Sequence, residues 1–75
     1  MRIALCNGAN QMEISHLSDD TRVGNIFSIY KRSMFLTLNM VKFVNGKEVA
    51  NAYVLKDGDR LEYFKKNGNL LKERQ

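Results

Sequence analysis

Apolar and polar residues alternate in the first part of the chain. The alternation runs through residues 1–6 and returns in residues 11–17. Such a period of two is typical of a strand with one buried face. Between the two stretches lies Asn7-Gly8, a dipeptide that favours tight hairpin turns because both residues tolerate positive φ. The pattern therefore predicts an opening β-hairpin.

A helical period replaces the alternation after residue 20. Apolar side chains recur at i, i+3, i+4 and i+7, at Val23, Ile26, Phe27 and Tyr30. This spacing places them in one stripe along a helix. Asp20 or Thr21 is expected to cap the helix by accepting hydrogen bonds from first-turn amides. The helix is expected to fade between residues 32 and 35.

The remaining chain alternates again and is divided by two turn motifs. A strand is predicted over residues 39–44, short extended pieces at Val49 and residues 53–55, and a last strand over residues 60–64. The turn motifs supply residues that tolerate positive φ or bond nearby amides, and Gly46 and Gly58 are expected at positive φ. The predicted structural turn residues are Asn7, Gly8, Asn45, Gly46, Asp57, Gly58 and Asp59.

The order of these elements predicts the fold class. One helix following a hairpin and preceding further strands must bury its stripe on one face of the sheet. We therefore expect an α+β protein with the β-grasp, or ubiquitin-like, fold: a mixed sheet of four to five strands with one main helix. The predicted core consists of Ile3, Leu5, Met12, Ile14, Val23, Ile26, Phe27, Val41, Phe43, Leu55 and Leu61.

Length and composition limit the kinds of function to consider. Seventy-five residues suit one small domain, predicted over residues 1–66, with a polar, flexible tail over residues 67–75. Cys6 and His16 are single, so we expect no disulfide, no metal site, no cofactor and no enzyme activity. A lone cysteine also favours a reducing, cytoplasmic location. No run of about 18 apolar residues occurs, so we expect no membrane association.

Charge is unevenly distributed along the chain. The net charge is +4, and the basic excess follows Asp59. A basic end attracts acidic surfaces, including nucleic acid, although most charged runs of this kind are simply solvated faces. The residues that could make such a contact are Lys65, Lys66, Lys72 and Arg74.

Three stretches together resemble one protein family. "MRIALCNG", "TRVGNIF" and "VKFVNGKEV…VLKDGDRLEYF" resemble the small sulfur carriers of thiamine and molybdopterin synthesis, over about residues 1–66. The resemblance implies a ubiquitin-like β-grasp fold. It also implies a C-terminal Gly-Gly, whose carboxylate an adenylating enzyme activates. The chain departs from that pattern, because it has no Gly-Gly and Gly68 is the single glycine after the predicted last strand.

Three functions therefore stay open. The first is a non-catalytic ubiquitin-like module that acts through protein–protein contact. The second is a sulfur carrier or protein modifier that a protease trims to end at Gly68, which would make the protease and an adenylating enzyme its partners. The third is an RNA-binding β-grasp module of the TGS kind, with charge for phosphates and the rings of Tyr63 and Phe64 for bases. We expect a protein partner before nucleic acid.

Overall fold

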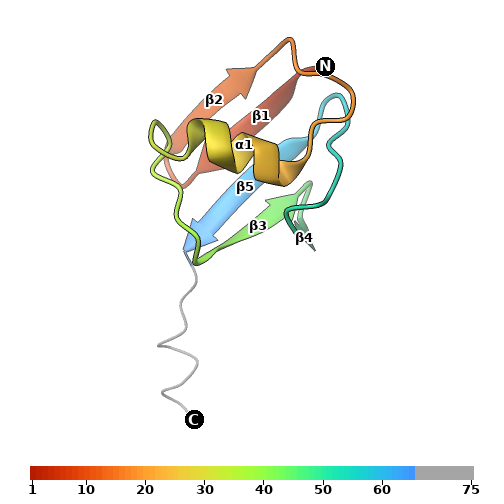
Figure 1. Ribbon diagram of the computed structural model, residues 1–75. Helices are drawn as coiled ribbons and strands as arrows, with labels where there is room; N and C mark the ends of the chain where they lie inside the picture. Colours follow the sequence, from red (N-terminus) through yellow and green to blue (C-terminus); the bar gives the residue numbers. More distant parts are fainter. Residues whose placement is uncertain (66–75) are drawn as a thin grey trace, which may run out of the picture.

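The computed structural model describes residues 1–65, which contain five strands and one helix (Figure 1). The elements in chain order are β1 (Ile3–Asn7), β2 (Asn10–Ile14), α1 (Val23–Tyr30), β3 (Met40–Val44), β4 (Lys47–Val49) and β5 (Arg60–Lys65). Gly68 and the predicted tail over residues 67–75 lie outside the described residues, as does Lys66.

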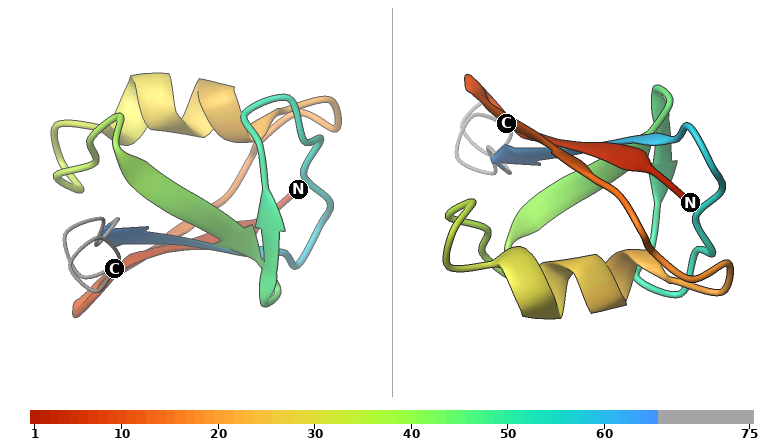
Figure 2. Two further views of the ribbon diagram at one scale, coloured as in Figure 1. Left: turned by 90° about the horizontal axis from the view of Figure 1, so that it is seen from below. Right: turned by 90° about the horizontal axis from the view of Figure 1, so that it is seen from above.

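The strands form one mixed sheet in the order β2-β1-β5-β3-β4. The central pair, β1 and β5, is parallel, and every other pair is antiparallel. Helix α1 packs on one face of this sheet, so the described part of the protein has two layers (Figure 2). The prediction of an α+β fold with a mixed sheet and a single main helix is confirmed.

The core lies between α1 and the sheet. Its buried members are Ile3, Leu5, Ile14, Val23, Ile26, Met34, Leu36, Val44, Leu55, Leu61 and Tyr63. Met12 and Phe27 are partly buried and pack against this cluster. Most of the predicted core is therefore found where the apolar patterns placed it.

The core prediction is wrong for Val41 and Phe43. The pairing between β3 and β5 sets Val44 opposite Leu61 on the helix side, which leaves Phe43 opposite Glu62 on the other side. Successive side chains of a strand point to opposite faces, so Val41 shares the outer face with Phe43. The alternation predicts the strand correctly, but the β3 side chain that enters the core is Val44.

The helix begins differently from the prediction. Neither Asp20 nor Thr21 caps it, because the amides of its first two residues are satisfied by the loop that precedes β5. The N–H groups of Val23 and Gly24 donate to backbone carbonyls in residues 51–53, at 3.0 and 2.9 Å. Thr21 instead donates from its hydroxyl to a carbonyl of the preceding turn, at 2.8 Å. Long-range backbone contacts thus replace the expected side-chain cap.

Candidate interaction surface: the open face of the sheet

One face of the sheet has no element packed on it within residues 1–65 (Figure 2). The strand pairing decides which side chains share this face, because directly opposed residues point the same way. The residues on this face are Ala4, Cys6, Gln11, Glu13, Val41, Phe43, Glu48, Arg60, Glu62 and Phe64. This open face is continuous across the strands of the sheet, because its members come from all five of them.

Aromatic side chains form the apolar part of the open face. Phe43 of β3 and Phe64 of β5 meet edge to face, with ring centroids 5.5 Å apart and an interplanar angle of 78°. Phe64 is 44% exposed, and Val41 lies opposite it in the register. We call Val41, Phe43 and Phe64 the aromatic patch. Edge-to-face rings hold each other in place, so the patch is an ordered apolar surface in contact with water.

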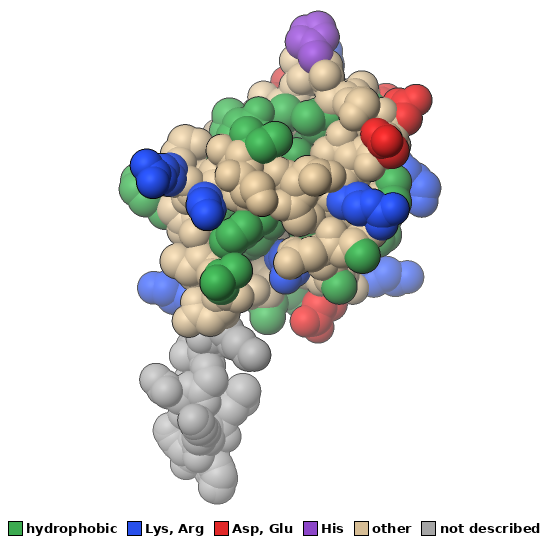
Figure 3. All heavy atoms as spheres, viewed as in Figure 1, with side chains coloured by type: hydrophobic (Ala, Val, Ile, Leu, Met, Phe, Trp, Pro, Cys, Tyr) green, Lys and Arg blue, Asp and Glu red, His purple; other side chains and the backbone are tan. Residues whose placement is uncertain are grey.

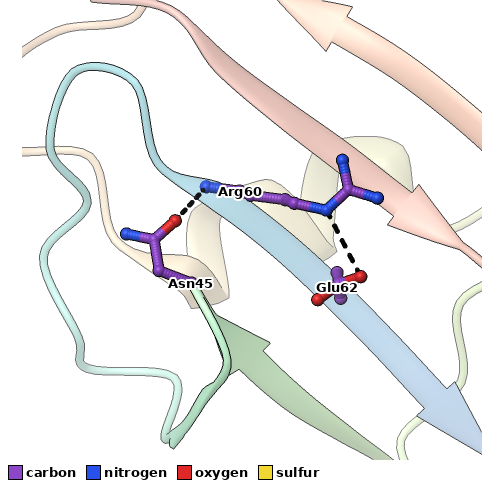
Figure 4. Close-up of polar contacts among 3 residues, drawn as sticks. All are labelled: Asn45, Arg60 and Glu62. Atoms are coloured by element: carbon purple, nitrogen blue, oxygen red, sulfur yellow. Dashed lines mark hydrogen bonds and ion pairs between the residues drawn. The ribbon is translucent and has the colours of Figure 1, made fainter.

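Ion pairs flank the aromatic patch. The Nε of Arg60 lies 3.3 Å from a carboxylate oxygen of Glu62, its neighbour on the same strand face (Figure 4). On the β1–β2 side, Arg2 and Glu13 approach to 3.7 Å, and both side chains are 65% exposed. Exposed pairs of this kind contribute little to stability. Here each arginine offsets the charge of one glutamate on the open face.

The two predicted turns at Asn45 and Asp59 lie in contact with each other. Asn45 donates from Nδ2 to a carboxylate oxygen of Asp59 at 2.9 Å. Its Oδ1 accepts the N–H of Arg60 at 2.9 Å, as Figure 4 shows. Asp59 is 6% exposed and also accepts the N–H of Lys56 at 2.8 Å. We call these contacts the turn clasp. It fixes the start of β5 against the end of β3, and so positions Arg60 and the strands that carry the aromatic patch.

The other predicted turn residues also make contacts distant in sequence. Asn7 donates from Nδ2 to the carbonyl of Met34 at 2.7 Å, which ties the end of β1 to the loop after the helix. Asp57 accepts the N–H of Arg2 at 2.8 Å, and Gly58 has a φ of 86°. These side chains hold separate segments together, a role that sequence spacing alone did not reveal.

Glycine provides the unusual backbone angles in the predicted turns. Gly8 and Gly46 have φ of 61° and 86°. Asn45 precedes Gly46 and has a φ of 52°, a value that asparagine tolerates better than most residues. The left-handed backbone expected at Gly46 and Gly58 is present.

The single cysteine and histidine of the sequence lie apart in the opening hairpin, because Cys6 pairs with Gln11 near the turn and His16 follows the other end of β2. Cys6 is 4% exposed, and burial raises the pKa of its thiol, an effect that the positive charge of Arg60 partly opposes. His16 is exposed at the far end of β2 and has a φ of 63°. Within residues 1–65 no three His, Cys, Asp or Glu side chains lie close enough to hold a metal ion.

Lys65, the predicted basic contact residue that the structure describes, does not belong to the open face. Lys65 ends β5 opposite Met40, which places it on the helix side of the sheet. Lys66, Lys72 and Arg74 lie outside the part of the chain that the structure describes, and so does Gly68. In the described part, the helix is too short to cross a membrane.

Comparisons with known proteins add information on the fold. No protein-family model matches the sequence, and no curated protein matches it. Several chains among the solved structures match this fold, including the two that follow. SAMP1 from Haloferax volcanii superimposes with a TM-score of 0.71 at 14% identity, over 88% of this chain and 96% of that one. A second structure, the H. volcanii small archaeal modifier protein 1, gives 0.68 at 14% identity, over 85% and 95%. The chain therefore has the β-grasp fold that the sequence predicted, and it shares this fold with the H. volcanii small archaeal modifier protein 1.

Proposed function

We propose that the protein is a non-catalytic, ubiquitin-like module that binds other proteins through the open face of its sheet. The aromatic patch is the observation that carries this proposal. Phe43 and Phe64 are fixed edge to face on a surface that the fold leaves uncovered, and Phe64 is 44% exposed. Aromatic side chains supply most of the binding energy in many protein interfaces, particularly when polar groups surround them. The Arg60–Glu62 pair provides such a border beside the patch.

The chemistry of the described residues supports binding over catalysis. Cys6, the one cysteine in the sequence, is buried and has a raised pKa, so little reactive thiolate forms at neutral pH. A free cysteine also supports a reducing, cytoplasmic compartment. The open face has no excess of positive charge, because Arg2 and Arg60 are paired with Glu13 and Glu62 and the face also carries Glu48; this favours a protein partner over RNA as its ligand.

A photocrosslinking experiment tests this proposal directly. Phe64 is replaced by benzoylphenylalanine, and cells that normally make the protein are irradiated. We expect a specific crosslinked protein, and we expect Phe43→Ser in the same chain to remove it. The matched control carries the crosslinker at Ser28, an exposed position on the helix. No adduct at position 64, or the same adducts from both positions, would refute the open face as the binding surface.

A second candidate function concerns the C-terminal end. The fold is similar to that of a protein named as a modifier, and Gly68 follows closely after β5, which ends at Lys65. In this alternative a protease removes residues 69–75, and an adenylating enzyme activates the carboxylate of Gly68. Intact-mass measurement of the protein from its native cells separates the two candidates. We expect the tail to be retained; a mass ending at Gly68, or a conjugate through it, would establish the modifier.

A further inference from the structure

A second unusual feature lies on the opposite side of the molecule, in the turn that follows α1. The N–H of Leu36 donates to the carbonyl of Lys31 at 2.9 Å, and that of Phe35 to the carbonyl of Arg32 at 3.4 Å. These two bonds define a Schellman motif, which requires one residue in the left-handed conformation. That residue is Phe35, with a φ of 56°. Glycine is the usual residue at this position because it has no Cβ to oppose the angle.

Stability does not account for a phenylalanine in the left-handed position. Its neighbours Met34 and Leu36 are 5% and 6% exposed and supply the packing of the turn. Phe35 itself is 70% exposed, so its ring gains little from burial while its backbone adopts an unfavourable angle. Unfavourable backbone angles that packing does not offset are concentrated at functional sites. The ring is therefore presented to solvent at a cost to the fold.

Other exposed apolar and basic residues lie in the same connection as Phe35 or at the same end of the sheet. Leu38, in the same connection, is 86% exposed. Lys31 and Arg32 lie in the turn itself, and Lys65 ends β5 on the helix side of the sheet, beside the start of β3. Figure 1 shows that the connection from α1 to β3 reaches the same end of the sheet as β5. We call Lys31, Arg32, Phe35, Leu38 and Lys65 the basic loop surface.

The charge of this region has a single sign. Residues 21–47 contain five basic residues and no Asp or Glu: Arg22, Lys31, Arg32, Lys42 and Lys47. Among the described residues, no ion pair involves Lys31, Arg32 or Lys65. On the helix side of the molecule, the acidic side chains in view lie away from the α1–β3 connection (Figure 3). The basic loop surface therefore carries positive charge that nothing in residues 1–65 neutralises.

We propose that the basic loop surface is a second docking site, and that its ligand is an acidic segment of a partner protein that carries apolar side chains. Unpaired cations select an acidic ligand, and Phe35 and Leu38 select apolar groups within it. Single-stranded nucleic acid fits less well, because the surface offers one aromatic ring for stacking beside an aliphatic side chain. An anionic membrane also fits less well, because two apolar side chains are few for insertion. The site is separate from the open face and does not depend on the function proposed for it.

Selection from a library of random short peptides displayed on phage tests the ligand chemistry. The intact protein is the bait. The library is first passed over the Phe35→Gly/Leu38→Ser double variant, which removes peptides that bind to other parts of the protein. We expect the remaining peptides to be rich in Asp and Glu, with Leu or aromatic residues between them. Neutral or basic peptides, or no peptide that distinguishes the two proteins, would overturn the proposal.

Binding measurements with the selected peptides test the residues. We expect Phe35→Gly to weaken binding about thirtyfold or more, the scale of an interface hot spot, while the thermal midpoint rises because the backbone strain is relieved. Lys31→Glu/Arg32→Glu should weaken binding similarly, and Lys47→Glu/Lys56→Glu, the same charge change at two exposed positions elsewhere, should not. A lower thermal midpoint for Phe35→Gly, or equal losses from both charge variants, would show that the surface is not a specific site.

Two further measurements separate this site from the open face and from a general affinity for polyanions. Phe64→Ser, on the open face, should leave binding of the selected peptides unchanged; its loss would assign the peptides to the sheet. Oligouridine and phosphatidylserine vesicles are tested beside the peptides at equal ionic strength. Tighter binding of either one, abolished by Lys31→Glu/Arg32→Glu, would reassign the surface to RNA or to membranes and overturn the proposal.

Discussion

Replacing Asn45 by alanine tests the turn clasp with a single substitution. In the native protein Asn45 donates to the buried carboxylate of Asp59 and accepts the N–H of Arg60, each at 2.9 Å. Alanine removes both hydrogen bonds and keeps a Cβ at a φ of 52°. The substitution therefore combines a loss of hydrogen bonding with a loss of conformational preference.

The size of the effect follows from the environment of each group. Asp59 is 6% exposed and keeps the N–H of Lys56 as a donor, so losing one of its partners should cost about 1–3 kcal/mol. The N–H of Arg60 is at the surface, where water replaces the lost acceptor at little cost. Alanine in the left-handed region adds about 1 kcal/mol relative to asparagine, which tolerates this region better. We therefore expect Asn45→Ala to lower the free energy of unfolding by about 2–4 kcal/mol.

Urea denaturation followed by circular dichroism measures this difference. Asn45→Gly is the matched control, because it removes the same hydrogen bonds and accepts the left-handed backbone. Asn45→Gly should have a free energy of unfolding roughly 1 kcal/mol higher than that of Asn45→Ala. An unfolding midpoint for Asn45→Ala equal to that of the native protein would refute the clasp. Equal losses for alanine and glycine would refute the conformational part of the reasoning.

Four further outcomes are expected. Burial raises the pKa of Tyr63 to about 12. Its neutral hydroxyl therefore contributes fully to the free energy of unfolding below about pH 10, and this contribution is lost as pH rises towards 12. Unfolding measured against pH should show a smaller alkaline loss of stability for Tyr63→Phe. Cys6 should react slowly with a thiol reagent at neutral pH and at the usual rate in urea. Ile26→Ala, at a fully buried position, should cost about 2–5 kcal/mol in thermal melts, more than Phe27→Ala at its partly buried one. Gly58→Val should destabilise by at least about 1 kcal/mol although no atom lies within 4 Å of the new Cβ, because φ is 86°.

Local sequence patterns predicted the elements of this fold better than their contacts. The hairpin, the helix and the turns follow from periodicity and from glycine and asparagine, which act over a few residues. Local patterns do not show which side chains of β3 face the helix. Val41, Phe43 and Val44 are all apolar, and only the pairing with β5 decides which of them is buried. The way α1 begins does not follow from local sequence either, because its amides are satisfied by carbonyls of a loop far along the chain.

The candidate surfaces were predictable to different degrees. The sequence shows Phe64 beside basic residues, but its alternation assigns Phe43 to the core, so the aromatic patch becomes apparent only from the strand register. The position of Phe35 could not be predicted, because a phenylalanine gives no local signal of left-handed backbone. The run of residues without acidic side chains is visible in the sequence, but it acquires meaning once Lys65 and the α1–β3 connection are seen at one end of the sheet.

The residues proposed for binding differ from those that hold the fold together. A structure at 14% identity shares this fold, which implies that the buried contacts and turn geometries can be satisfied by largely different sequences. Phe64 and Phe35 are 44% and 70% exposed, and neither is needed to fill the core. Phe64 lies on the open face and Phe35 lies in the connection after α1. We therefore expect that either side chain can be replaced without unfolding the domain or altering the other surface. A variant that binds at one surface and fails at the other would therefore show that the two surfaces bind independently of each other.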